Sequence, residues 1–311
     1  MERHLIRASR RQDASRCAKA FVVATSWPTR SLMAVVTVAA VFFLAPPLEG
    51  QSLNSNAPVY LALGDSYPFG SRCDTTSCSP PGSFDSAKND NFYVGYPDYL
   101  QLMIDRPLIN AACPGEWTSG FITLGAPTGP ACPQVRALGL LHIEYAVSQM
   151  EFAEDYLRTH DRVQLVTLQL GGPQTIAFFQ SCQSNPTCIL AGLPAHTAWL
   201  VADITTILSR LRATGYSGQV IFVEYPSTNY NTFTSQILAQ LHQAILPVLD
   251  AYGVQKAPVY DVFRVAAAPF GGDSCAAGLL ITTATGVCNV HPTAAGHQLI
   301  ASIIAGIAQA H

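Results

Sequence analysis

Hydrophobic and polar positions along the chain follow two alternating patterns. Short apolar runs bounded by Gly or Pro predict buried strands, and longer stretches with apolar residues three or four apart predict helices. The expected strands are residues 59–63, 107–111, 163–170, 219–223 and 258–263. The expected helices are residues 96–103, 145–158, 190–214, 234–252 and 293–310. Strands that alternate with helices predict an α/β fold in which a parallel sheet lies between two layers of helices.

The first 50 residues differ from the rest of the chain. They contain seven basic and three acidic residues, and residues 32–45 are uncharged and almost wholly apolar. That run is short for a membrane span and has the length of a signal-peptide core. We therefore expect residues 1–50 to form a basic leader and signal peptide and residues 51–311 to form one domain. An uncleaved membrane anchor is the alternative, because the basic leader is long for a signal peptide.

Without this leader the domain is acidic. The chain has 17 basic and 20 acidic residues, so 10 and 17 remain and give a net charge of −7. Neither a basic patch nor basic residues interleaved with aromatic ones indicate nucleic acid as a partner. We expect a secreted or extracytoplasmic monomer without obligatory membrane contact after signal cleavage.

The cysteines agree with export. Of nine, one lies in the leader, and the other eight fall into four pairs that are close in sequence. The pairs are Cys73 with Cys78, Cys113 with Cys132, Cys182 with Cys188, and Cys275 with Cys288. An even number of cysteines beside a signal peptide predicts disulfides. Their irregular spacing lacks the Cys-x-x-Cys pairs typical of metal sites, so we predict neither a metal nor another cofactor.

A serine follows the first expected strand directly. The apolar run at 59–63 ends in Gly-Asp-Ser, which places Ser66 at the carboxyl end of a strand, where ligands of open α/β sheets bind. Serine becomes a nucleophile when a base takes its proton, and His291 near the end of the chain is a candidate base. A plain turn is the competing interpretation, since Gly, Asp and Ser are all turn formers.

Four segments together resemble the SGNH, or GDSL-type, hydrolases, a family of esterases and lipases. Gly-Asp-Ser at 64–66 resembles the first block of that family, and Asn-Ala-Ala-Cys-Pro-Gly-Glu at 110–116 resembles the second. Leu-Gln-Leu-Gly-Gly at 168–172 resembles the start of the third block, and His-Pro at 291–292, with a Gly soon after, resembles the last. The four segments stand in the family's order and span nearly all of residues 51–311.

The resemblance implies a flavodoxin-like, three-layer α/β/α sandwich, which is the SGNH hydrolase fold. It implies that Ser66 is the nucleophile and His291 the base, and that the backbone amides of Ser66 and Gly115 form an oxyanion hole. A glycine at this position lets the backbone approach a reacting group closely.

Two positions depart from the family's pattern. The third block continues Gly-x-Asn-Asp in the family, with the Asn donating to the oxyanion, whereas this chain has Pro173 and Gln174. Proline lacks a donor, so the amide of Gln174 is the candidate replacement. The acid that orients the histidine is expected three residues before it, where this chain has Cys288. We therefore expect a Ser–His pair without an acid, with a backbone carbonyl near Cys288 orienting the imidazole.

These observations predict a secreted serine esterase that cleaves small-molecule or lipid esters, either acyl lipids or acetylated carbohydrate. The Gly-x-Ser-x-Gly pentapeptide of the α/β-hydrolases does not occur in the sequence. Asp261 and Asp273 are interpreted as structural, and Asp65 as fixing the turn before the serine. The alternative is a non-catalytic or nearly inactive member of the family that keeps the pocket and binds a ligand or glycan, for which Pro173 is the best evidence.

Overall fold

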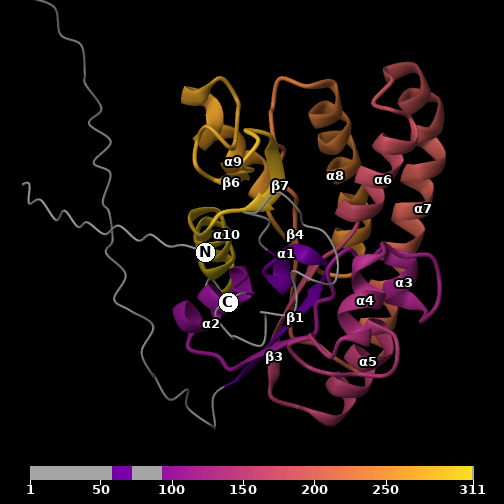
Figure 1. Cartoon of the computed structure of the whole chain (residues 1–311). Coiled ribbons are helices and arrows are strands. Elements are labelled where there is room, and N and C mark those ends of the chain that lie inside the picture. The colour runs from indigo at the N-terminus through magenta and orange to yellow at the C-terminus, as the bar shows by residue number, and fades with distance from the viewer. Residues whose placement is uncertain (1–57, 72–92, 310–311) are drawn as a thin grey trace, which may run out of the picture. The chain divides into compact units, whose positions relative to one another are not determined.

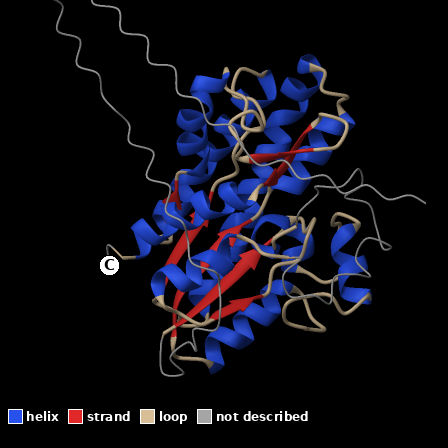
Figure 2. Cartoon of the chain, turned by 60° about the vertical axis from the view of Figure 1, so that its left-hand side comes forward, coloured by secondary structure: helices blue, strands red, loops and turns tan. Residues whose placement is uncertain are grey.

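A computed structural model describes residues 58–71 and 93–309 of the chain. Five parallel strands form the main sheet, in the order β2-β1-β3-β4-β5 (Figure 2). The strands are β1 Val59–Gly64, β2 Leu108–Asn110, β3 Val163–Gln169, β4 Gln219–Val223 and β5 Gln255–Ala257. This order is that of the flavodoxin-like fold, in which the strand order reverses between β1 and β3. The predicted α/β architecture is therefore confirmed.

Helices cover both faces of the sheet (Figure 1). The helices are α1 Ser66–Phe69, α2 Tyr96–Ile104, α3 Thr118–Ile122, α4 Ala131–Ala137, α5 Gln149–Thr159, α6 Gly172–Ser181, α7 Pro186–Ala213, α8 Phe233–Ala251, α9 Val259–Ala267 and α10 Ala294–Ala308. Helices α5, α7 and α8 pack on one face, and α2, α9 and α10 pack on the other.

The alternation of side chains along β1 explains both layers. Leu61 and Leu63 belong to the core on one face, and Tyr60 and Ala62 belong to the core on the other. All four are fully buried. Because successive side chains of a strand point to opposite faces, a continuous apolar run is what a central strand covered on both sides requires.

A separate antiparallel pair, β6 Leu280–Thr282 and β7 Cys288–Pro292, lies beyond one end of the main sheet (Figure 2). His291 and Pro292, which resemble the start of the family's last block, therefore lie on a strand. The Cys275–Cys288 disulfide ties the start of β7 to the segment before β6. Its effect is to hold the strand that carries His291 against the preceding loop.

The expected strand at 258–263 is wrong. Residues 259–267 form α9, and the strand of that region is the shorter β5 just before it. Val259, Phe263 and Ala267 are the buried residues of α9. Their spacing of four places them on one helical face against the sheet, and this periodicity outweighs the β propensity of the same stretch.

Three of the predicted disulfides are formed: Cys113–Cys132, Cys182–Cys188 and Cys275–Cys288. The fourth predicted pair, Cys73 with Cys78, and the predicted leader at 1–50 lie outside the described residues. Within the described ranges, α7 alone is long and apolar enough to span a membrane. Helices that pack on a sheet meet the same criterion, and the second half of α7 is packed in the core.

Candidate active site

Ser66 is the first residue of α1, two positions beyond the last residue of β1, and is 8% exposed. Asp65 caps this short helix, because its Oδ1 accepts the backbone N–H of Tyr67 at 3.3 Å. Its Oδ2 accepts the hydroxyl of Tyr225. Burial raises the pKa of Asp65 to about 7, although both hydrogen bonds oppose that rise. Asp65 thus fixes the turn that presents the serine, as predicted from the sequence.

The segments that carry Ser66, Gly115 and Gly171 converge at the end of β1. The carbonyl of Gly64 accepts the N–H of Cys113 at 2.9 Å, and Gly64 is paired with Gln169 of β3. Ser66 follows Gly64 by two residues, Gly115 follows Cys113 by two, and Gly171 follows Gln169 by two. The first three blocks of the sequence therefore meet at the carboxyl edge of the sheet, where its strand order reverses.

The side chain of Gln149 from α5 reinforces this junction. Its Oε1 accepts the N–H of Gly64 at 2.6 Å, and its Nε2 donates to the Gly64 carbonyl at 3.0 Å. The same Nε2 lies 3.2 Å from Oε2 of Glu116, which is 2% exposed. Burial raises the pKa of Glu116 to about 7. Hydrogen bonds from the buried Gln149 side chain to Gly64 and Glu116 thus stabilise the end of β1.

His291 lies on β7 and is half-buried. Its Nδ1 is 2.8 Å from Oδ1 of Asn289, and the backbone N–H of His291 donates to the same oxygen at 2.9 Å. A backbone N–H can only donate, so the Asn289 atom that contacts both groups is the carboxamide oxygen. Nδ1 of His291 therefore donates to this oxygen and carries a proton. Desolvation lowers the pKa of His291 to about 4. The imidazole is therefore neutral at pH 7, with Nε2 as its acceptor.

Asn289 is the residue that sequence reasoning missed. The expected orienting group was a backbone carbonyl near Cys288, whose sulfur is bonded to Cys275. The side-chain oxygen of Asn289 instead contacts the imidazole. Residues two apart on a strand point to the same side, whereas residues three apart point to opposite sides. A strand assignment for 288–292 would have singled out Asn289.

Tyr67 connects the serine turn to the strand that carries the histidine. Its hydroxyl donates to the backbone carbonyl of Val290, and its ring centroid lies 6.0 Å from that of His291. Among the described residues, no hydrogen bond joins Ser66 to His291. The two side chains are held on neighbouring segments, and Tyr67 makes the contact between those segments.

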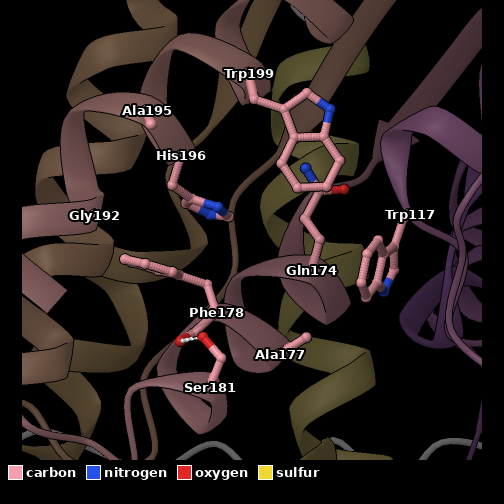
Figure 3. Close-up of a pocket in the computed structure, with 9 residues that line it drawn as sticks. All are labelled: Trp117, Gln174, Ala177, Phe178, Ser181, Gly192, Ala195, His196 and Trp199. Atoms are coloured by element: carbon pink, nitrogen blue, oxygen red, sulfur yellow. Dashed lines mark hydrogen bonds between the residues drawn. The ribbon is translucent and has the colours of Figure 1, made fainter. Parts of the chain in front are cut away.

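Gln174 is the third residue of α6, in its first turn, and is 1% exposed. Its Oε1 accepts the N–H of Thr118 at 2.7 Å, which leaves Nε2 on the other side of the carboxamide. Within the described chain this buried Nε2 has no hydrogen-bond partner. Pro173, just before it, is half-buried and supplies no donor. Gln174 lines a pocket that also contains Trp117 and Trp199, and Figure 3 shows its side chain among the residues of this lining.

Other candidate residues have structural partners. Asp261 forms an ion pair with Arg264, and Asp273 accepts the N–H groups of Cys275 and Ala276. In the described ranges, each cluster of side chains with the spacing of metal ligands contains a disulfide. Bonded sulfurs do not act as thiolate ligands, so these clusters offer no complete ligand set.

These features define a class: a three-layer α/β protein with a serine at the carboxyl edge of its sheet and a neutral histidine on an adjacent segment. The model of the GDSL-like lipase/acylhydrolase family matches residues 62–299. The chain belongs to that family, whose members are carboxylic ester hydrolases.

Three solved structures are similar to this chain, and the first of them agrees with its fold. Phospholipase A1 from Streptomyces albidoflavus NA297 is 20% identical, over 81% of this chain and 98% of that chain, with a TM-score of 0.51. The extracellular lipase from Streptomyces rimosus is 17% identical, over 79% of this chain and 99% of that chain, with a TM-score of 0.48. The aryl esterase from M. smegmatis is 17% identical, over 82% and 99%, with a TM-score of 0.44. No curated protein matches the chain. At 20% identity the likeness to phospholipase A1 concerns the fold alone.

Proposed function

We propose that this chain is an exported serine esterase in which Ser66 attacks the ester carbonyl and His291 acts as the general base. Asn289 orients the histidine in place of the family's acid. The observation that carries this proposal is the hydrogen bond between His291 and Asn289, on a strand joined by Tyr67 to the turn that bears Ser66. It leaves a neutral imidazole whose Nε2 accepts a proton, which is the form that a general base requires.

The oxyanion hole in this proposal consists of the backbone amides of Ser66 and Gly115 and of Nε2 of Gln174. Gly115 has a φ of +76°, a conformation that favours glycine, and it lies two residues after Cys113, whose N–H donates to the Gly64 carbonyl. The unpartnered Nε2 of Gln174 supports its role, because a buried amide without a partner costs free energy that a ligand oxygen recovers. In this proposal the Gln174 amide takes the place of the Asn side chain that the family has at the position of Pro173.

The reaction has two halves. In the first, Oγ of Ser66 bonds to the acyl carbon, its proton moves to Nε2 of His291, and that proton then passes to the departing alcohol as the ester C–O bond breaks. In the second, water attacks the acyl-serine, His291 takes a proton from the water, and the carboxylic acid leaves as Oγ regains its proton. Hydrogen bonds between nucleophile and base are often long before substrate binds and tighten in the complex.

The direct test is hydrolysis of p-nitrophenyl esters by the oxidised protein, compared with Ser66→Ala and with Ser302→Ala, a control serine exposed on α10. We expect turnover to fall to background in Ser66→Ala alone. In Gln174→Leu we expect kcat to fall about 10²–10³-fold, the cost of one oxyanion donor. Turnover by Ser66→Ala equal to that of the wild type would refute the assigned nucleophile.

Pro173 favours a second candidate function, that of a ligand-binding or nearly inactive family member. In that case wild type and Ser66→Ala are equally inactive, and Pro173→Asn gains activity because it restores the donor of the family's pattern. Retained ligand binding in Ser66→Ala, without turnover in the wild type, would distinguish this candidate from the esterase.

A further inference from the structure

An apolar cavity of about 530 Å³ lies between α6, α7 and the loop after β2. Figure 3 shows the side chains around it, with the rings of Phe178 and His196 on one side and the two indoles on the other. The lining residues are Trp117, Gln174, Ala177, Phe178, Ser181, Gly192, Ala195, His196 and Trp199. Its volume falls within the roughly 300–1,000 Å³ of pockets that hold small organic ligands.

Aromatic rings form most of the walls. His196 stacks on Phe178 with centroids 4.6 Å apart and an angle of 11° between the planes. Trp199 meets His196 and Trp117 edge to face, with centroids 6.0 Å apart in each pair. Glycine at position 192 is required here, because a Cβ would lie 2.8 Å from the Phe178 ring. The walls are therefore preformed rather than collapsed.

The cavity carries no formal charge. No residue from Val163 to Ala202, a range that includes all of α6 and the first half of α7, is Asp, Glu, Lys or Arg. Burial lowers the pKa of His196, so its ring is neutral at pH 7, and its Nε2 is 3.1 Å from the Thr175 hydroxyl. A ligand carboxylate would find no cationic partner among the lining residues.

The side-chain acceptors in the lining are mostly engaged with the protein itself, which disfavours a sugar. The Ser181 hydroxyl donates to the backbone carbonyl of Phe178, and His196 contacts Thr175. In the described lining, Nε2 of Gln174 is the buried side-chain donor without a partner. Nε2 of Gln174 matches a carbonyl oxygen, whereas the side-chain acceptors of Gln174, His196 and Ser181 that sugar hydroxyls would need already take part in hydrogen bonds.

The cavity shares Gln174 with the proposed oxyanion hole. Trp117 follows Gly115 by two residues, and Gln174 follows Gly171 by three, so both lining residues belong to segments that converge on the end of β1 beside Ser66. The Thr118–Gln174 hydrogen bond joins these two segments. A carbonyl oxygen that accepts from Nε2 of Gln174 would lie at the wall of the cavity, so the rest of the acyl group could occupy it.

We infer that this cavity binds the acyl chain of the substrate and that the chain is an apolar one of about eight carbons or an aromatic acyl group, not acetyl. The inference rests on the proposed esterase function. An acetyl methyl group has roughly the volume of one water molecule, about 30 Å³, and would leave most of the cavity empty. Each further buried methylene increases kcat/KM about fourfold until the cavity is filled.

The first experiment compares kcat/KM for p-nitrophenyl acetate, butanoate and octanoate. The variants are Ala195→Trp, which places an indole in the cavity, and Ala198→Trp, a matched exposed alanine on the same helix outside the lining. We expect the wild type to prefer octanoate over acetate by at least 10²-fold, Ala195→Trp to lower this ratio at least tenfold, and Ala198→Trp to leave it unchanged. A wild-type preference for acetate, or a ratio that Ala195→Trp does not alter, would overturn the inference.

A second experiment separates the cavity from catalysis. Octanamide and butanamide are titrated calorimetrically into Ser66→Ala, where no turnover occurs. We expect octanamide to bind with at least a tenfold lower Kd than butanamide, and the added Ala195→Trp substitution to abolish the difference. If wild-type turnover is absent while this difference persists, the esterase proposal fails and the cavity assignment stands. Equal binding of the two amides refutes the cavity assignment whatever the turnover.

Discussion

Oδ1 of Asn289 accepts hydrogen bonds from both the imidazole Nδ1 and the backbone N–H of His291, at 2.8 and 2.9 Å. The pair reproduces the geometry of an acid and a histidine without the charge of the acid. A carboxylate at this position would stabilise the imidazolium, and a neutral amide does so less. This agrees with a His291 pKa that burial lowers to about 4.

Replacement of Asn289 by Asp should therefore move the pH dependence of activity. A carboxylate next to the imidazole raises its pKa by about 1–3 units. Since the base must be neutral, the acid limb of the kcat/KM profile should rise from near pH 4 in the wild type to between about pH 5 and 7 in Asn289→Asp. The measurement is kcat/KM for a p-nitrophenyl ester from pH 3.5 to 8.

Asn289→Ala serves as the control, because it removes the acceptor without adding charge. Its kcat should fall at every pH, since the imidazole is no longer oriented, and its acid limb should not move upward. An acid limb at the same pH in the wild type and in Asn289→Asp would contradict the proposed role of His291 as the base.

The position of Ser66 was predictable from the sequence, but the hydrogen bond that supports His291 was not. An apolar run that ends at Gly64 defines a buried central strand, and that alone places Ser66 at the carboxyl edge. The prediction for His291 used a fixed spacing of three residues to an acid. That spacing presumes a loop or turn before the histidine, and here Cys288 and His291 point to opposite sides of β7.

Contacts between distant segments explain the other differences between the predicted and the observed structure. The bond from Tyr67 to Val290 joins residues 223 positions apart, and no local pattern indicates it. The segment at 258–263 contains both an alternating and a helical apolar pattern, and the packing of Phe263 in the core decides for the helix. Tertiary burial, rather than intrinsic propensity, selected the element there.

Tyr67→Phe tests the contact between the serine turn and β7. The variant keeps the ring and loses the hydroxyl that donates to the Val290 carbonyl. We expect kcat to fall about tenfold with little change in KM, because the histidine is less well fixed while the binding cavity is intact, and stability to fall by about 1 kcal/mol. Steady-state kinetics and denaturant unfolding measure both. The control is Tyr252→Phe, whose hydroxyl makes no hydrogen bond within the described residues; an equal loss of kcat there would refute the specific role.

Gly172→Ala tests the packing at the start of α6. A Cβ at Gly172 would lie 2.5 Å from the ring of Tyr225, whose hydroxyl is bound to Asp65. Because that ring is fixed, we expect the substitution to lower stability by about 1–3 kcal/mol. Gly306→Ala in α10, where no atom lies within 4 Å of the added Cβ, should raise stability by about 0.5–1 kcal/mol. Melting temperatures that shift in the same direction for both variants would show that the Tyr225 contact is not decisive.

Glu116→Gln should change how stability depends on pH. Burial raises the pKa of Glu116 in the folded protein from 4.5 to about 7, so between these values the folded state binds a proton that the unfolded state has released. Stability therefore falls as pH rises through this window. The glutamine avoids this loss, so the variant should be as stable as the wild type near pH 4.5 and more stable by about 3 kcal/mol at pH 8, at about 1.4 kcal/mol per pKa unit.

Glu154 provides the opposite case, because its hydrogen bonds to Arg210, at 2.8 and 2.9 Å, lower its pKa. Glu154→Gln should destabilise the protein at pH 7 and have less effect as pH falls below 4.5. Denaturant unfolding at pH 4.5, 6 and 8 measures both variants, and a difference between Glu116→Gln and wild type that does not grow with pH would mean that Glu116 is ionised in the folded protein throughout this range.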